Sequence, residues 1–195
     1  LDYFEETYNF RPDEQWLERA RMSALRFSSF CSASFISPKG LILTNHHCSR
    51  GVVGDLMKEG EDFDKNGFYA ATMGEERKAP GLYVKQLVKM EDITKYIEEK
   101  TKDAADEAEM KQLQATALEA AVEEYQKKEG WEELELETVT YYSGGKFSIY
   151  GYKRYDDIRL VLIPELQLGY FGGDPDNFTY PRYALDFTLW RAYEN

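Results

Sequence analysis

The chain has 195 residues, 43% hydrophobic and 31% charged, which is enough to bury the core of one domain or of part of a larger one. Its 36 acidic and 24 basic side chains give a net charge of −12, which disfavours binding to nucleic acids. The apolar runs are too short to span a bilayer, so we expect no membrane span. The chain begins at Leu1 without a basic, apolar leader, and we expect that a leader has been removed or that the chain is shortened.

Helix and strand patterns alternate in the first half of the chain. Pro12 suits the first turn of a helix that continues to residue 24. Residues 25–36 alternate loosely between apolar and polar types, and residues 40–44 form a short apolar run after a turn. Both predict strands, as does the pattern of residues 82–88.

The most acidic part of the chain predicts a helix. Residues 103–128 consist mainly of Ala, Glu, Lys, Gln and Leu, with no Gly or Pro. Residues 95–138 carry 14 acidic and 6 basic side chains, which is two thirds of the net charge of −12. An acidic binding arm and a solvated helix packed on a sheet both fit this pattern. We favour the second, because such charge patterns usually mark exposed helix faces.

The second half of the chain returns to strands. Ser143-Gly144-Gly145 separates two strand patterns and predicts a hairpin. Seven or so short strands with one helical excursion, at about residues 92–128, predict a mainly β fold built on an antiparallel barrel. The last strand patterns cover residues 138–142, 146–152, 157–163 and 185–193.

The segment Thr-Asn-His-His-Cys at residues 44–48 comes directly off an apolar strand and holds candidate catalytic residues. The base of a serine or cysteine hydrolase needs a rigid, half-exposed position between a nucleophile and an orienting carboxylate. The chain has only two cysteines, Cys31 and Cys48, which are too few for a thiolate zinc site but can form one disulfide. Such a bridge would stabilise the fold by about 3 kcal/mol and would imply an oxidising compartment.

The two histidines also allow plainer interpretations. A short His-His pair is weak evidence for function, and one of the two rings is expected only to pack. Adjacent residues on a strand point to opposite faces, so His46 and His47 are not expected to bind one metal ion. We therefore expect neither a metal nor a cofactor.

Three segments give this chain a resemblance to a known family. They are CSASFISPKG at residues 31–40, LTNHHC at residues 43–48 and FGGDPDNFTYPR at residues 171–182. Together they resemble the bacterial serine dipeptidyl-peptidase family that includes dipeptidyl-peptidases 7 and 11, within the chymotrypsin clan. The resemblance covers residues 16–195 and implies a chymotrypsin-like antiparallel β-barrel, one of two in such enzymes.

The resemblance implies roles for particular residues. His47 matches the general base of the family, and Asp186 matches the carboxylate that orients the base. Asn177 matches the residue that helps to hold the free α-amino group of the substrate. Phe178 stands where relatives often have Trp, which keeps an aromatic wall but loses an indole N–H. Cys31 and Cys48 match the family's disulfide beside the base.

Two acidic residues near Asn177 have several interpretations. Asp174 and Asp176 lie in a Gly-Gly-Asp-Pro-Asp segment, where Asx side chains commonly cap backbone N–H groups of a turn. Metal binding or acid–base chemistry is the less favoured interpretation. Electrostatic attraction of the substrate ammonium stays open, more for Asp176 than for Asp174.

The family's nucleophilic serine has no counterpart in this chain. The family places it much later, in a second barrel after a helical insertion. Ser143 lacks the preceding Gly-Asp and precedes Asp186, whereas the family order is His, Asp, Ser. The whole chain, residues 1–195, is thus expected to be the N-terminal part of a peptidase catalytic domain, inactive alone.

The resemblance implies a periplasmic or cell-surface enzyme that acts on peptides with a free N-terminus, and it leaves a homodimer of the full-length enzyme open. The alternative is a non-catalytic periplasmic peptide-binding module. A Gly-x-Ser-Gly motif downstream would decide for the enzyme, and a natural stop at Asn195 for the module.

Overall fold

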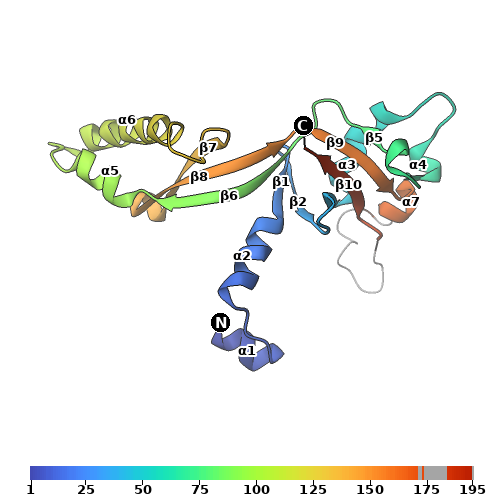
Figure 1. The fold of residues 1–195 in the computed structure, drawn as a ribbon, viewed down its shortest axis with the longest axis horizontal. Coiled ribbons are helices and arrows are strands. Elements are labelled where there is room, and N and C mark those ends of the chain that lie inside the picture. Colours follow the sequence, from blue (N-terminus) through green and yellow to red (C-terminus); the bar gives the residue numbers. More distant parts are fainter. Residues whose placement is uncertain (171–172, 174–183, 195) are drawn as a thin grey trace. The chain divides into compact units, whose positions relative to one another are not determined.

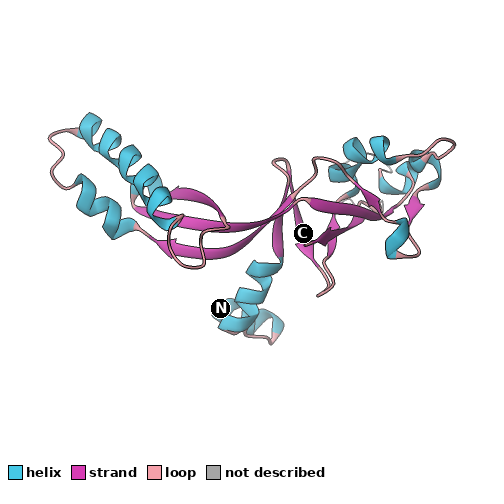
Figure 2. Ribbon diagram, turned by 45° about the horizontal axis from the view of Figure 1, so that its top comes forward, coloured by secondary structure: helices cyan, strands magenta, loops and turns pink. Residues whose placement is uncertain are grey.

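The structure is a computed structural model of the chain, and it describes residues 1–170, 173 and 184–194 (Figure 1). The described residues form two compact units. The first comprises Leu1–Gln86 and Tyr155–Asn195, and the second Leu87–Arg154. The architecture is mainly an antiparallel β sheet with several helices (Figure 2), so the predicted mainly β class is confirmed. Among the described helices, none combines the length and the apolar character needed to cross a membrane.

The first unit begins with two helices and then builds a sheet. Its strands pair in the order β4-β9-β10-β3-β2-β1-β6, and β5 also pairs with β9. The helices are α1 (Asp2–Tyr8), α2 (Glu14–Ser23), α3 (His46–Val53), α4 (Phe63–Asn66) and α7 (Leu166–Gly169), with 3-10 turns η1 (Gly54–Leu56) and η2 (Met73–Glu75). The strands are β1 (Ala24–Phe27), β2 (Cys31–Phe35), β3 (Leu41–Thr44), β4 (Phe68–Tyr69), β5 (Arg77–Lys78), β9 (Asp157–Ile163) and β10 (Thr188–Tyr193), together with the first residues of β6 (Val84–Asp92), which continues into the second unit at Leu87.

The core of this unit follows the alternation of the strands. In β3, Ile42 and Thr44 are buried while Leu43 is exposed, as expected for a strand with one face on the core. Trp190 of β10 and Phe27 of β1 are both fully buried, with ring centroids 5.8 Å apart. Aromatic rings at this separation bury large areas and fix the packing between strands.

The pairing of β3 with β10 matters most for the site. The ladder runs from Thr188 opposite Thr44 to Arg191 opposite Leu41. The end of β3 and the beginning of β10 therefore lie side by side. Residues just after β3 and just before β10 are brought together, although they are far apart in sequence.

The strand ladders do not close into a ring. Among the described residues, the strand order ends at β4 and β5, both paired to β9, on one side, and on the other it continues past β6 through β8 to β7 without returning to β9. Antiparallel pairing agrees with the prediction, but the ladders show an open sheet where a closed barrel was expected. β4 and β5 have only two residues each, which leaves little backbone for another ladder.

The helical excursion belongs to the second unit. It contains α5 (Thr94–Thr101) and α6 (Glu107–Tyr125), and strands β7 (Glu135–Tyr141) and β8 (Lys146–Tyr155) follow, joined by η3 (Tyr142–Gly144). The two helices lie along one side of the strands, and Ile97, Ala117 and Ala121 pack with Trp131 and Ile149 (Figure 1). The preferred interpretation, a solvated helix packed on a sheet, is confirmed.

Several boundaries differ from the predictions. Residues 25–36 form two strands, because the chain reverses after Phe27 with Ser28 in the left-handed region at φ 51°. The predicted helix begins later, at Glu107, because Asp106 caps it by accepting from the backbone N–H of Glu109. The hairpin around Ser143 is confirmed, with Tyr141 opposite Lys146.

Candidate active site

His46 and His47 begin a helix rather than end a strand. Asn45 is the N-cap residue of α3, and the two histidines are its first two residues. The expectation that they alternate as in a strand was therefore wrong. Successive residues of a helix nevertheless differ by about 100° in direction. His46 is 2% exposed, whereas the side chain of His47 keeps 37% of its surface exposed.

The carboxylate of Asp186 meets the ring of His47. Nδ1 of His47 lies 2.7 Å from Oδ2 of Asp186, which is a hydrogen-bonding distance. The backbone N–H of His47 donates to Oδ1 at 3.0 Å. The Asp186 side chain is only 7% exposed, so this contact is well shielded from water. An ion pair or hydrogen bond with a shielded carboxylate is stronger than the same contact in water.

This geometry fixes which ring nitrogen can react. A carboxylate that accepts from Nδ1–H holds the ring in one orientation and one tautomer, and it stabilises the imidazolium that forms on protonation. In that arrangement Nε2 is the ring nitrogen that carries no proton in the neutral form and can accept one. Within the described part of the chain, the ring of His47 has no hydrogen-bond partner besides Asp186.

A disulfide lies beside this pair. Cys31 of β2 and Cys48 of α3 are bonded, with Cα atoms 6.1 Å apart, so the predicted bridge is present. The bridge ties the first turn of α3 to the sheet. Ligand atoms of Cys31, His47 and Cys48 all lie within 4.8 Å of one another, a spacing compatible with a metal site. However, both sulfurs are already used by the disulfide.

His46 occupies a tight internal position. Gly169 of α7 packs against its ring so closely that an added Cβ would lie 2.5 Å from Cδ2. Burial lowers the pKa of His46 below its ordinary value, while a hydrogen bond to the backbone of Pro164 and the charge of Asp186 act in the opposite direction. Nδ1 of His46 has no partner among the described residues. His46 is therefore a neutral, packed ring, as expected for one member of the pair.

The remaining predicted residues have different outcomes. Asn177, Phe178, Asp174 and Asp176 lie outside the described residues. Ser143 lies in the turn of the β7–β8 hairpin, as the structural interpretation predicted.

Sequence reasoning missed two contacts of the site. Nδ2 of Asn45 donates to Oδ2 of Asp186 at 3.1 Å, and Gly169 packs on His46. An Asn directly before a helix predicts a cap, so the signal at Asn45 was present but pointed to another role. Nothing in the sequence links Gly169 to His46.

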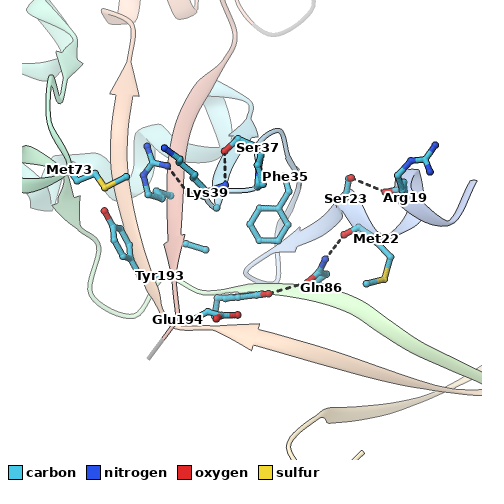
Figure 3. Close-up of a pocket in the computed structure, with 15 residues that line it drawn as sticks. Arg19, Met22, Ser23, Phe35, Ser37, Lys39, Met73, Gln86, Tyr193 and Glu194 are labelled. Carbon is cyan, nitrogen blue, oxygen red and sulfur yellow. Dashed lines mark hydrogen bonds between the residues drawn. The ribbon is translucent and has the colours of Figure 1, made fainter. Parts of the chain in front are cut away.

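A separate pocket lies elsewhere in the first unit. It has a volume of about 660 Å³ and is lined by α2, the turn before β3, and the end of β10 (Figure 3). Phe35 and Met22 contribute apolar surface, while Lys39 and Arg19 contribute positive charge. His47 and Asp186 do not line it. Arg191 pairs with Leu41 at the end of the β3–β10 ladder away from Thr188 and Thr44, and Gly40, just before β3, accepts from the backbone N–H of Ala192.

Comparisons with known proteins give the family and the relatives of this chain. The profile of the family described as "Peptidase S46" matches residues 1–195. The chain is 37% identical to dipeptidyl-peptidase 7 of Porphyromonas gingivalis over 169 residues, covering 86% of this chain and 23% of that protein. It is 35% identical to the Asp/Glu-specific dipeptidyl-peptidase of Capnocytophaga gingivalis over 171 residues, covering 88% and 24%. The chain thus spans about a quarter of the length of these relatives.

Solved structures show the same fold. The crystal structure of Porphyromonas endodontalis DPP11 matches with a TM-score of 0.74 and 27% identity, covering 90% of this chain and 25% of that one. A crystal structure of that protein in complex with the dipeptide Arg-Glu matches with a TM-score of 0.70 and 25% identity, covering 89% and 26%. The open sheet of this chain is therefore compatible with the fold of a dipeptidyl-peptidase.

Proposed function

The chain belongs to the peptidase S46 family, and from this membership we propose that it is the N-terminal portion of a serine dipeptidyl-peptidase that releases dipeptides from peptide N-termini. The observation that carries the proposal is the 2.7 Å contact between Nδ1 of His47 and Oδ2 of Asp186. Such a pair is the part of a serine-peptidase triad that prepares a base. The names of the relatives supply the reaction class.

In this proposal His47 is the general base and Asp186 its orienting carboxylate. Nε2 of His47 takes the proton from a serine hydroxyl as the serine oxygen bonds to the carbonyl carbon of the peptide. The protonated ring then gives this proton to the leaving amine as the C–N bond breaks. The serine, its oxyanion donors and a second barrel belong to the remainder of the longer protein.

The substrate in this proposal is a peptide with a free N-terminus. Asn177 would accept a hydrogen bond from the α-ammonium group, and Phe178 would form an apolar wall beside it. The neighbour crystallised with a dipeptide supports this substrate class. The disulfide between Cys31 and Cys48 supports an oxidising compartment, which we propose to be the periplasm or the cell surface.

A peptide-binding module without catalysis is the alternative. It would keep the contacts for the α-amino group, and the pair of His47 and Asp186 would have no chemical task. The contact between the two residues favours the enzyme, because a shielded carboxylate directed at a half-exposed imidazole has a clear use in proton transfer.

The test uses the longest natural polypeptide that contains these residues. Chromogenic dipeptidyl amides with free and with acetylated N-termini are offered as substrates. We expect release of the dipeptide only from the free form, and a fall in kcat of at least about 1,000-fold in His47→Ala. Circular dichroism and the melting temperature would verify that the variant folds.

Two outcomes would contradict the proposal. Equal cleavage of acetylated substrates would reject a dipeptidyl-peptidase that reads a free amino group. Peptide binding without turnover, in a natural polypeptide that lacks a downstream Gly-x-Ser-Gly, would establish the binding module instead.

A further inference from the structure

Asn45 has an unusual role for a residue at the beginning of a helix. It is the N-cap of α3, yet its side chain makes no capping hydrogen bond. An N-cap Asn normally uses its oxygen to accept from a backbone N–H in the first turn. Here Nδ2 is used instead, and it donates to Asp186. The chemistry of this side chain is therefore directed at the carboxylate rather than at the helix.

The amide of Asn45 holds Asp186 at two points. Nδ2 donates to Oδ2 of the carboxylate at 3.1 Å and to the backbone carbonyl of Asp186 at 3.1 Å. Asp186 lies two residues before β10, outside the strand ladder that begins with Thr188. The amide of Asn45 therefore restrains both the backbone and the carboxylate of Asp186.

Asn45 and His47 share one acceptor atom. Oδ2 of Asp186 accepts from Nδ2 of Asn45 at 3.1 Å and faces Nδ1 of His47 at 2.7 Å. Oδ1 accepts from the backbone N–H of His47. These donors fix the plane of the carboxylate, so that one lone pair of Oδ2 stays directed at the imidazole. The bond from Asn45 thus opposes a rotation of the carboxylate that would carry Oδ2 away from Nδ1.

A buried hydrogen-bond chain holds Asn45 itself in place. Its backbone carbonyl accepts from Oγ of Ser49 at 3.3 Å, and Oγ accepts from Nε1 of Trp190 at 2.9 Å. Ser49 and Trp190 are both fully buried. Buried and satisfied networks of this kind rigidify the groups they join. The beginning of α3 is thereby fixed to β10, the strand that follows Asp186.

We infer that Asn45 is a positioning residue, which orients the carboxylate of Asp186 so that His47 keeps its proton on Nδ1. This inference rests on the proposed function, because the tautomer of His47 matters for turnover only if His47 is the base. The competing role is that of an ordinary helix cap. The two roles require opposite properties of the side chain, since a cap must accept and this positioning residue must donate.

Asn45→Asp separates the two roles. Asp is as good a helix cap as Asn and has nearly the same volume, so a capping role would survive the change. However, an ionised Asp cannot donate a hydrogen bond to Asp186, and it places a second carboxylate next to it. In the longest natural polypeptide we expect kcat to fall by about 100-fold in Asn45→Asp with KM nearly unchanged. The fall in kcat should be smaller in Asn45→Ala, because this change adds no charge.

A matched control makes the same chemical change on the surface. Asn66, the last residue of α4, is exposed, and Asn66→Asp adds the same charge there. We expect this variant to keep the wild-type kcat. If Asn45→Asp also keeps the wild-type kcat, or if only KM changes, the positioning role is rejected.

The effect of Asn45 on the tautomer of His47 can also be measured by spectroscopy, without enzyme turnover. Nitrogen-15 shifts of the His47 ring in the 195-residue chain report which nitrogen carries the proton, and His46→Gln identifies the His47 signals. We expect a single Nδ1–H tautomer in the wild type, and a mixture in Asn45→Asp. An unchanged tautomer in Asn45→Asp would overturn the inference even if the enzyme is active. Absence of dipeptide release by the wild-type polypeptide would instead reject the proposed function and leave this measurement valid.

Discussion

Nδ1 of His47 and Oδ2 of Asp186 lie 2.7 Å apart although 139 positions separate the two residues in the sequence. The pairing of Thr44 with Thr188 brings them together, since His47 follows β3 and Asp186 precedes β10. One strand ladder and the first turn of one helix therefore position the pair. The disulfide between Cys31 and Cys48 links the same helical turn to β2.

The first prediction concerns Asp186 as a hydrogen-bond acceptor. Asp186→Asn keeps the shape of the side chain, but its amide can donate to Nδ1 and so select the wrong tautomer of His47. We expect kcat of the longest natural polypeptide to fall by about 10,000-fold. The matched control is Asp13→Asn, because Asp13 caps α2 and Asn caps equally well. A residual activity of Asp186→Asn near that of Asp13→Asn would show that Asp186 does not orient the base.

The second prediction concerns the disulfide. The bridge links residues 17 positions apart, and its loss in a Cys31→Ala/Cys48→Ala double variant should lower the free energy of unfolding by about 3 kcal/mol. Urea denaturation of the 195-residue chain, with and without a thiol reductant, measures this. The reductant should shift the midpoint of the wild type and leave that of the double variant unchanged. Equal midpoints for the wild type in both conditions would contradict a structural bridge.

The fold could be predicted well wherever the pattern is local. A short apolar run predicted the strand around Ile42, alternation predicted the strand around Ile158, and composition predicted the helix that contains Ala117, because each signal comes from neighbours along the chain. The turn at Ser28 was missed, since a left-handed serine has no strong sequence signature. The failure of the described ladders to close depends on pairings between distant strands, which periodicity does not encode.

The candidate site could be predicted only through the resemblance. No local pattern connects His47 with Asp186, whereas family motifs did connect them. Motifs carry residue roles but not the contacts around them. The second hydrogen bond to Asp186, from Asn45, and the packing of Gly169 on His46 result from three-dimensional placement, and so they became visible only in the structure.

The third prediction concerns Gly169. A Cβ at this position would lie 2.5 Å from Cδ2 of His46, so Gly169→Ala must displace the ring or the α7 backbone. We expect the free energy of unfolding to fall by about 1–3 kcal/mol. Gly51 of α3 is the matched control, because an added Cβ there meets no atom within 4 Å. Gly51→Ala should be neutral or stabilise by up to about 1 kcal/mol. Equal effects of both changes in urea denaturation would refute the tight packing.

The last prediction concerns pH. Burial lowers the pKa of His46 in the folded state below its ordinary value of 6.5, against the hydrogen bond to Pro164 and the charges of Asp186 and Asp64. The nearby charge of Arg50 acts in the same direction as burial. The unfolded chain therefore binds a proton at this residue at a higher pH than the folded chain does. The free energy of unfolding should fall as pH drops through about 6.5, because protonation then favours the unfolded state.

The measurement compares wild type with His46→Gln, a variant that cannot titrate at this position. Urea denaturation of the 195-residue chain between pH 7.5 and 5 gives the free energy of unfolding of each protein. The variant is expected to be less stable at pH 7.5, because Gln fits the space beside Gly169 less well, but its disadvantage should shrink as pH falls. His47 is present in both proteins, so its contribution cancels in the difference. If the difference in free energy of unfolding between wild type and His46→Gln stays constant, or grows toward pH 5, the buried His46 ring does not oppose protonation.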